Sequence, residues 1–189
     1  MRTFAALCLF VMLFGALGFC QLPGGNVFVG YSYLGAEQVS GGHASLNGWN
    51  ASGEVKVFPF IGLVADFSGH YGSENLPSSI VCNGIGPCTP LTANANVSQH
   101  NFLFGPRVSF SIGKFRPFAH ALIGASHLSE NNAGLSNSDT SFADALGGGL
   151  DYKLIPLISW RFQGDALQTR FFNSTQNDFR FSTGIVIHF

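Results

Sequence analysis

Charged residues are scarce in this chain. Asp, Glu, Lys and Arg make up only 10% of its 189 residues, whereas an average soluble domain has roughly 25%. The nine basic and ten acidic residues give a formal net charge of −1 and leave no basic face for nucleic acid. A hydrophobic fraction of 46% and an aromatic fraction of 14% argue against a disordered chain. The composition therefore points away from an ordinary soluble enzyme and towards a membrane protein.

Long apolar runs are also scarce, and the single one opens the chain directly after Arg2. A positive start, an apolar stretch and small residues near its end are typical of a secretory signal peptide. We expect residues 1–20 to be such a signal, cleaved between Cys20 and Gln21. One alternative is an uncleaved anchor helix, for which the run is at the short end of the ~17–25 residues that span a bilayer. Another is a lipoprotein signal, which would need a small residue in place of Phe19.

Residues 21–189, the expected mature domain, contain no further apolar run of the ~18 residues that a transmembrane helix needs. Hydrophobic and polar residues alternate instead. In lipid, backbone polar groups are satisfied only in helices or in a closed barrel, so the alternation favours a barrel. Most of the alternating segments reach the ~9–11 residues of a tilted spanning strand. The expected strands are 26–34, 47–57, 61–71, 97–110, 115–126, 141–153, 158–172 and 177–189.

The connections between these strands alternate in length. Residues 58–60, 111–114 and 154–157 form tight turns, while longer segments rich in Gly, Ser, Asn and Thr alternate with them. One rim of short turns and one rim of longer loops is typical of an outer-membrane barrel. The sequence therefore predicts an all-β, eight-stranded, antiparallel, up-and-down transmembrane β-barrel. The expected longer loops are 35–46, 72–96 and 127–140, and the fourth, 173–176, is short.

Most of the few charges in the expected strands share the parity opposite to the large apolar residues. An eight-stranded barrel has an interior just wide enough for side chains, so inward charges must be paired. Four acids and five bases nearly cancel, which predicts a salt-bridge network that closes the lumen. The alternative is a narrow, gated ion path. His120 fits neither parity cleanly, and the inward one is preferred. The predicted network is Glu54, Lys56, Asp66, Arg107, Asp151, Lys153, Arg161, Asp165 and Arg180.

The chain has four cysteines, of which Cys82 and Cys88 lie in the longest expected loop, in the segment VCNGIGPC. The Asn-Gly and Gly-Pro pairs between them favour a compact turn, so we expect a disulfide in an oxidising compartment. A metal site is the alternative, but it lacks a second pair of ligands. No cofactor is expected.

Several segments together resemble the OmpA/OmpX-type outer-membrane barrels, the outer membrane protein beta-barrel domain family. They include GNVFVGYSYL, GLVADFSGHYG, FLFGPR, GGGLDYK and RFSTGIVIHF. The resemblance implies a bacterial outer-membrane location, lipid as the surrounding partner and the barrel-assembly machinery during insertion. In the last strand, Ser182, Gly184, Ile187 and Phe189 resemble the insertion signal read by that machinery, and the alternative is a soluble strand that happens to end in Phe. Because loops vary on a shared scaffold, no loop ligand is implied.

A hydrolase site is the remaining possibility that the residue types allow. His127, Ser129 and Glu130 supply the groups of a serine hydrolase, and their spacing resembles the His-x-Ser of lipid A deacylase barrels. That family carries its motif near the end of the chain, whereas three expected strands follow here. We therefore expect a non-enzymatic surface or structural protein acting through its external loops. A narrow pore and a lipid A-modifying enzyme are the alternatives.

Overall fold

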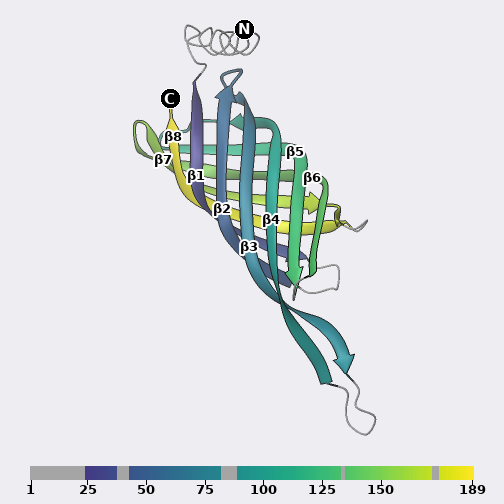
Figure 1. Cartoon of the computed structure of the whole chain (residues 1–189). Coiled ribbons are helices and arrows are strands. Elements are labelled where there is room, and N and C mark those ends of the chain that lie inside the picture. The colour runs from purple at the N-terminus through teal and green to yellow at the C-terminus, as the bar shows by residue number, and fades with distance from the viewer. Residues whose placement is uncertain (1–23, 38–42, 82–88, 133–134, 172–174) are drawn as a thin grey trace, which may run out of the picture.

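In the computed structural model, the described residues are 24–37, 43–81, 89–132, 135–171 and 175–189. Each strand pairs antiparallel with the next, and β1 pairs with β8, so the sheet closes on itself (Figure 1). The predicted eight-stranded antiparallel barrel is confirmed. The strands are β1 (Gly25–Glu37), β2 (His43–Lys56), β3 (Ile61–Val81), β4 (Thr89–Ser109), β5 (Phe115–Asn132), β6 (Leu135–Ile155), β7 (Ile158–Thr169) and β8 (Gln176–His188).

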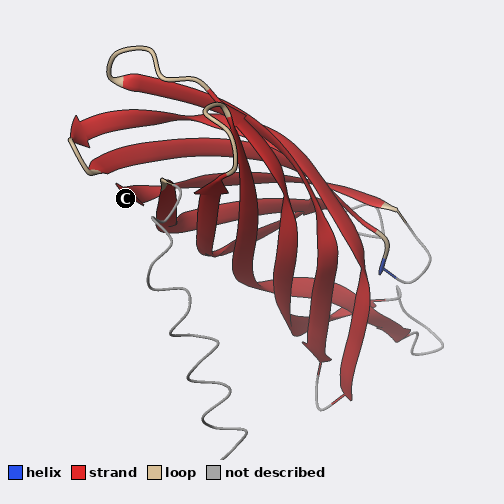
Figure 2. Ribbon diagram, turned by 90° about the horizontal axis from the view of Figure 1, so that it is seen from above, coloured by secondary structure: helices blue, strands red, loops and turns tan. Residues whose placement is uncertain are grey.

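The strands are curved and wind around a common interior (Figure 2). One rim carries the tight turns, such as that between β4 and β5, where Gly113 adopts a φ of 61° that L side chains rarely take. The backbone of Phe189 bonds to that of Gly25 at the same rim, so β1 begins where β8 ends. We refer to this rim, which carries the tight turns, as the turn end and to the opposite rim as the loop end.

No helix in the described part of the chain is long and apolar enough to cross a membrane.

The strands extend further towards the loop end than their alternation predicts. β3 continues to Val81 and β4 begins at Thr89, and the two form a hairpin that projects beyond the other strands (Figure 1). β5 and β6 likewise close to within two residues of each other, whereas β7 ends at Thr169 rather than at 172. A β-ladder requires only backbone partners, so pairing continues where neither face needs to be apolar. The alternation of apolar and polar residues therefore predicts only the part of each strand that has one apolar and one polar face.

The barrel wall has its large apolar side chains outside and its polar side chains inside, which is the reverse of a soluble barrel. Along β7, Trp160 and Phe162 are exposed, whereas the alternate residues Arg161 and Gln163 are buried. The same pattern holds in β4, where Phe104 is exposed and Arg107 is buried. An apolar exterior around a polar interior is the arrangement of a transmembrane β-barrel, because lipid contacts the outside.

Candidate functional site: the barrel lumen

A bidentate ion pair between β6 and β7 lies towards the turn end of the lumen. Asp151 and Arg161 stand opposite each other in the paired strands. The Nε and Nη2 atoms of Arg161 donate to the two carboxylate oxygens of Asp151 at 2.6 and 2.8 Å. A planar guanidinium fork on a carboxylate is a strong form of side-chain ion pair. Both side chains are almost fully buried, so each charge is stabilised by its partner in place of water.

Arg180 of β8 joins two carboxylates from different walls of the barrel. Its Nε donates to Asp165 of the neighbouring β7 at 2.8 Å, and its Nη1 donates to Asp66 of β3 at 2.7 Å. The amides of Asn50 and Gln163 donate to the same two carboxylates. Since β3 and β8 are not neighbours in the sheet, the contact with Asp66 crosses the lumen. One buried guanidinium thus connects walls that the backbone ladder does not connect directly.

Glu54 of β2 is the centre of a second cluster. Arg107 Nη1 lies 3.3 Å and Arg116 Nη2 lies 3.7 Å from its carboxylate, and the Asn26 amide donates to it at 2.7 Å. The guanidinium of Arg107 also lies over the ring of Phe118, with Cζ 4.4 Å from the centroid. An aromatic face attracts a cation through its quadrupole. The ring therefore covers one face of the guanidinium while the carboxylate binds its edge.

His120 points inward and connects these clusters. Arg107 Nη2 lies 3.3 Å from Nδ1 of the imidazole, and Nε2 lies 2.8 Å from an Asp165 oxygen. Because arginine only donates hydrogen bonds, Nδ1 accepts one, and Nε2 carries the proton that is donated to Asp165. Phe118 and Leu122 share the inward side, as the preferred parity requires. The ion pairs thus form one network rather than separate contacts.

Two of the nine predicted lumen charges lie outside these ion pairs. Lys56 Nζ bonds to the carbonyl of Pro59 and to Ser109 Oγ, and Lys153 is exposed beside a register shift at the end of β6. This corrects the prediction, because parity gives the side of the wall but not the depth along the strand. Arg116, which the sequence reading did not include, contacts Glu54 instead. Arg116 lies four residues before His120 in β5 and therefore faces the same side of the strand, which is the sequence signal that would have identified it.

Neutral polar residues fill the lumen beside the charges, and the charge-based reading did not identify them. Ser32 and Ser182 hydroxyls bond to each other at 2.9 Å, and His70 Nε2 bonds to the same Ser32 hydroxyl. Asn101 donates to Ser68 from the neighbouring strand. These side chains are buried, so their polar groups need hydrogen-bond partners within the lumen.

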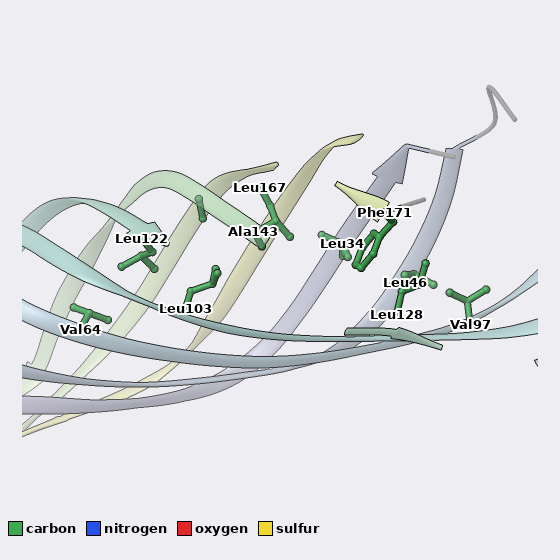
Figure 3. Close-up of a cluster of buried hydrophobic side chains, with 11 residues drawn as sticks. Leu34, Leu46, Val64, Val97, Leu103, Leu122, Leu128, Ala143, Leu167 and Phe171 are labelled. Atoms are coloured by element: carbon green, nitrogen blue, oxygen red, sulfur yellow. The ribbon is translucent and has the colours of Figure 1, made fainter. Parts of the chain in front are cut away.

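Buried apolar side chains also line the lumen (Figure 3). Leu34 and Leu46 are opposite each other in β1 and β2, and both are buried. A cluster of this kind inside the barrel has no counterpart in the predicted site, since the sequence reading followed charges alone. The apolar cluster, as we call it, comprises Leu34, Leu46, Val64, Val97, Leu103, Leu122, Leu128, Ala143, Ala145, Leu167 and Phe171.

Comparisons with known proteins place this geometry among solved membrane barrels. No protein-family model and no curated protein matches the chain. Neisserial surface protein A matches at 13% identity and a TM-score of 0.65, covering 87% of this chain and 97% of that one. The chain shares the fold of this membrane barrel, a closed antiparallel barrel of eight strands.

Two further structures show the same fold. Ail of Yersinia pestis, in complex with the heparin analogue sucrose octasulfate, matches at 14% identity and a TM-score of 0.58, covering 87% of this chain and 98% of that one. The N-terminal β-barrel domain of Pseudomonas aeruginosa OprF matches at 12% identity and a TM-score of 0.52, covering 87% and 99% of the two chains.

The outer surface of the barrel changes from apolar to more polar towards the loop end. Trp160 and Phe104 belong to an apolar belt, whereas nearer the loops Tyr71 bonds to His100 across the strands at 3.1 Å. Tyrosines with one apolar and one hydrogen-bonding end are typical of membrane–water interfaces. The transition therefore marks the boundary of the lipid-compatible surface.

His127 belongs to this polar part of the exterior. It is exposed, and its Nδ1 bonds to Thr140 Oγ1 on β6 at 2.7 Å. Ser129, the other member of the considered hydrolase pair, stands opposite Ser138 nearer the loop end, and the side chain of Glu130 lies outside the described side chains. The imidazole is thus engaged by Thr140 rather than by Ser129.

The remaining predicted residues are placed as follows. Ser182 and Gly184 are buried, while Ile187 and Phe189 are exposed on the apolar side at the turn end. The expected signal at 1–20 and the expected disulfide between Cys82 and Cys88 lie outside the described residues. Within the described part of the chain, no three His, Cys, Asp or Glu side chains group as metal ligands would.

Proposed function

We propose that this chain is a non-enzymatic protein of the bacterial outer membrane that is anchored by its barrel and acts at the cell surface through its loops. The observation that carries the proposal is the inversion of the wall, with large apolar side chains outside and paired charges inside. An apolar exterior of this kind is unstable in water and suited to lipid. The fold shared with Neisserial surface protein A and Ail supports the same assignment.

The proposal includes a closed lumen. The ion-pair network crosses the lumen, and the buried side chains of the apolar cluster pack beside it. An ion crossing the barrel would have to displace Arg180 from two carboxylates and pass between these apolar side chains. Both steps oppose conduction, because buried charges need partners and apolar constrictions exclude water. The barrel thus serves as an anchor rather than as a pore.

Membrane fractionation together with heat-modifiable gel mobility tests the placement. The expected result is recovery with outer-membrane vesicles and a folded band that shifts on boiling, with assembly reduced when Phe189 is deleted. Phe110→Ala, which removes an equally exposed aromatic side chain at the turn end, serves as the matched control. Recovery in the soluble fraction would contradict the proposal.

Two measurements test the activity assigned to the barrel. In planar bilayers the purified protein is expected to give no discrete channel openings, and reproducible openings would favour the narrow pore. Mass analysis of lipid A with and without expression is expected to show the same acyl pattern. A changed pattern would favour the lipid-modifying enzyme and would direct attention to His127 and Ser129.

A further inference from the structure

The charges outside the ion-pair network are separated along the barrel axis. Arg170 is the single base near the loop end among the described residues, whereas Lys56, Lys114 and Lys153 lie at the turn end, beside Arg116 of the network. No Asp or Glu side chain outside the network accompanies these bases at the turn end in the described chain. The six other acidic residues all belong to the loop-side parts of their strands, and they are Glu37, Glu74, Glu130, Asp139, Asp144 and Asp178.

A cavity of about 270 Å³ opens at this basic rim. It lies between the β4–β5 turn, the β6–β7 turn and the end of β8, and its walls include Lys114, Arg116, Lys153, Ser159 and His188. Lys114 and Lys153 are exposed, whereas Ser159 is 97% buried. The cavity therefore combines exposed cations with a buried polar group.

The hydrogen bonds in the cavity wall determine which groups are free to bind a ligand. Arg116 Nη1 lies 3.4 Å from His188 Nδ1, and His188 Nε2 lies 3.0 Å from Ser159 Oγ. Since arginine only donates, His188 accepts at Nδ1 and donates from Nε2, which leaves the Ser159 hydroxyl proton free to donate. The carboxylate of Asp151, the acid of this wall, is held on both oxygens by Arg161. The uncommitted groups facing the cavity are thus donors and cations.

We infer that this cavity binds a phosphate-bearing group. An ionised phosphate offers three strong acceptor oxygens, which matches several separate donors better than a carboxylate with two oxygens. Phe115 in the cavity wall is exposed, as are Ile112 and Leu157 in the two turns that border the cavity. A cationic pocket beside an apolar rim suits the headgroup of an anionic phospholipid, whose acyl chains would lie along the barrel exterior. A free phosphate shares the headgroup chemistry without the chains.

Native mass spectrometry of the purified mature protein in non-ionic detergent tests this site. The probes are phosphatidylglycerol, the matching diacylglycerol without phosphate, and inorganic phosphate as competitor. We expect one phosphatidylglycerol per barrel and no retained diacylglycerol. Competition by inorganic phosphate would identify the phosphate itself as sufficient, whereas binding without competition would identify the lipid headgroup as the source.

Single-residue variants distinguish a specific binding site from a general attraction of the positive charges for an anionic lipid. Lys114→Gln and Lys153→Gln are each expected to weaken phosphatidylglycerol binding by about fivefold. Ser159→Ala, which leaves the charge unchanged, is expected to weaken it by about two- to tenfold. Arg170→Gln removes the same charge at the opposite end and is expected to have no effect. Heat-modifiable mobility verifies that each variant is folded.

Three outcomes would overturn the inference. They are equal retention of diacylglycerol and phosphatidylglycerol, no stoichiometric binding of either phosphate probe, and equal weakening by Arg170→Gln and by the two lysine variants. Because the binding is measured in detergent, it does not depend on the location or the surface role proposed above.

Discussion

Gly147 stands opposite the carboxylate of Asp165 in the barrel wall. A Cβ at Gly147 would overlap Asp165 Oδ1 and would lie 2.6 Å from the Gly164 carbonyl. Gly62 is similarly placed against Glu54, with its Cβ position 2.6 Å from Oε1. Small residues on the inward face therefore provide the space in which the carboxylates of the network lie, and these positions are as much a part of the site as the charges.

Gly147→Ala is expected to lower the free energy of unfolding by about 1–3 kcal/mol, because the added methyl group displaces Asp165 from its partners. Gly53→Ala is the matched control, since a Cβ at Gly53 meets nothing within 4 Å. Urea unfolding in phospholipid vesicles, followed by heat-modifiable mobility, measures both. Equal midpoints for the two variants would show that Asp165 does not need this space.

Arg180→Met removes the cation that two buried carboxylates share. Breaking a buried ion pair from one side typically costs about 3–5 kcal/mol, because an unpaired charge remains. The expected result is a large loss of stability in the same urea assay, with Arg170→Met, at an exposed position, close to the parent protein. A small effect at Arg180 would mean that Asp66 and Asp165 find other partners.

At the scale of the strands, the inward faces carry both polar and apolar side chains. The buried inward residues of β1 run from Asn26 through Phe28 and Ser32 to Leu34. Leu34 stands opposite Arg180 of β8, and Val64 stands opposite Glu54 of β2. The apolar cluster therefore packs beside the ion pairs, and both kinds of side chain fill the lumen.

This filling of the lumen predicts how thiol reagents enter it. In a background where Cys82 and Cys88 are serine, Leu122→Cys is expected to react far more slowly with a water-soluble maleimide than Ser45→Cys or Lys153→Cys. Leu122 is buried in the apolar cluster, whereas Ser45 and Lys153 are exposed near the two ends, and thiol reactivity requires access and ionisation. Rapid labelling at Leu122 would show a water-filled lumen and would contradict the closed barrel.

At the scale of the whole molecule, the outer surface decides the environment. Phe104 lies within the exposed apolar face of β4, while Phe58 is equally exposed in the β2–β3 turn. The two side chains have the same chemistry and differ in depth along the barrel axis. A transmembrane barrel should therefore respond differently to charge at the two positions.

Phe104→Arg is expected to destabilise the barrel in vesicles by about 2–4 kcal/mol, because the charge would lie near the bilayer midplane. Phe58→Arg, at the interface, is expected to cost only about 0–1 kcal/mol. The difference between their urea midpoints in vesicles measures the depth dependence. Equal effects would contradict a spanning orientation of β4.

The sequence determined which residues face inward. Alternation gave the eight strands and the parity of Asp66, Arg107 and Arg180, because a wall with lipid on one side tolerates charge only on the other. It could not give partners or depth, since these depend on strands that are distant in sequence. The cross-lumen bond from Arg180 to Asp66, the rim positions of Lys56 and Lys153, and the long β3–β4 hairpin are examples.

The sequence by itself thus determined the class of fold and the sidedness of its wall, through the local period of two that every strand must obey. Barrel closure decided the rest. It brought β1 against β8, opposed Asp66 with Arg180, gathered Leu34 and Phe171 into the apolar cluster, and placed donors around the turn-end cavity. These arrangements exist only in three dimensions, because closing the sheet sets how far each inward side chain lies from the opposite wall.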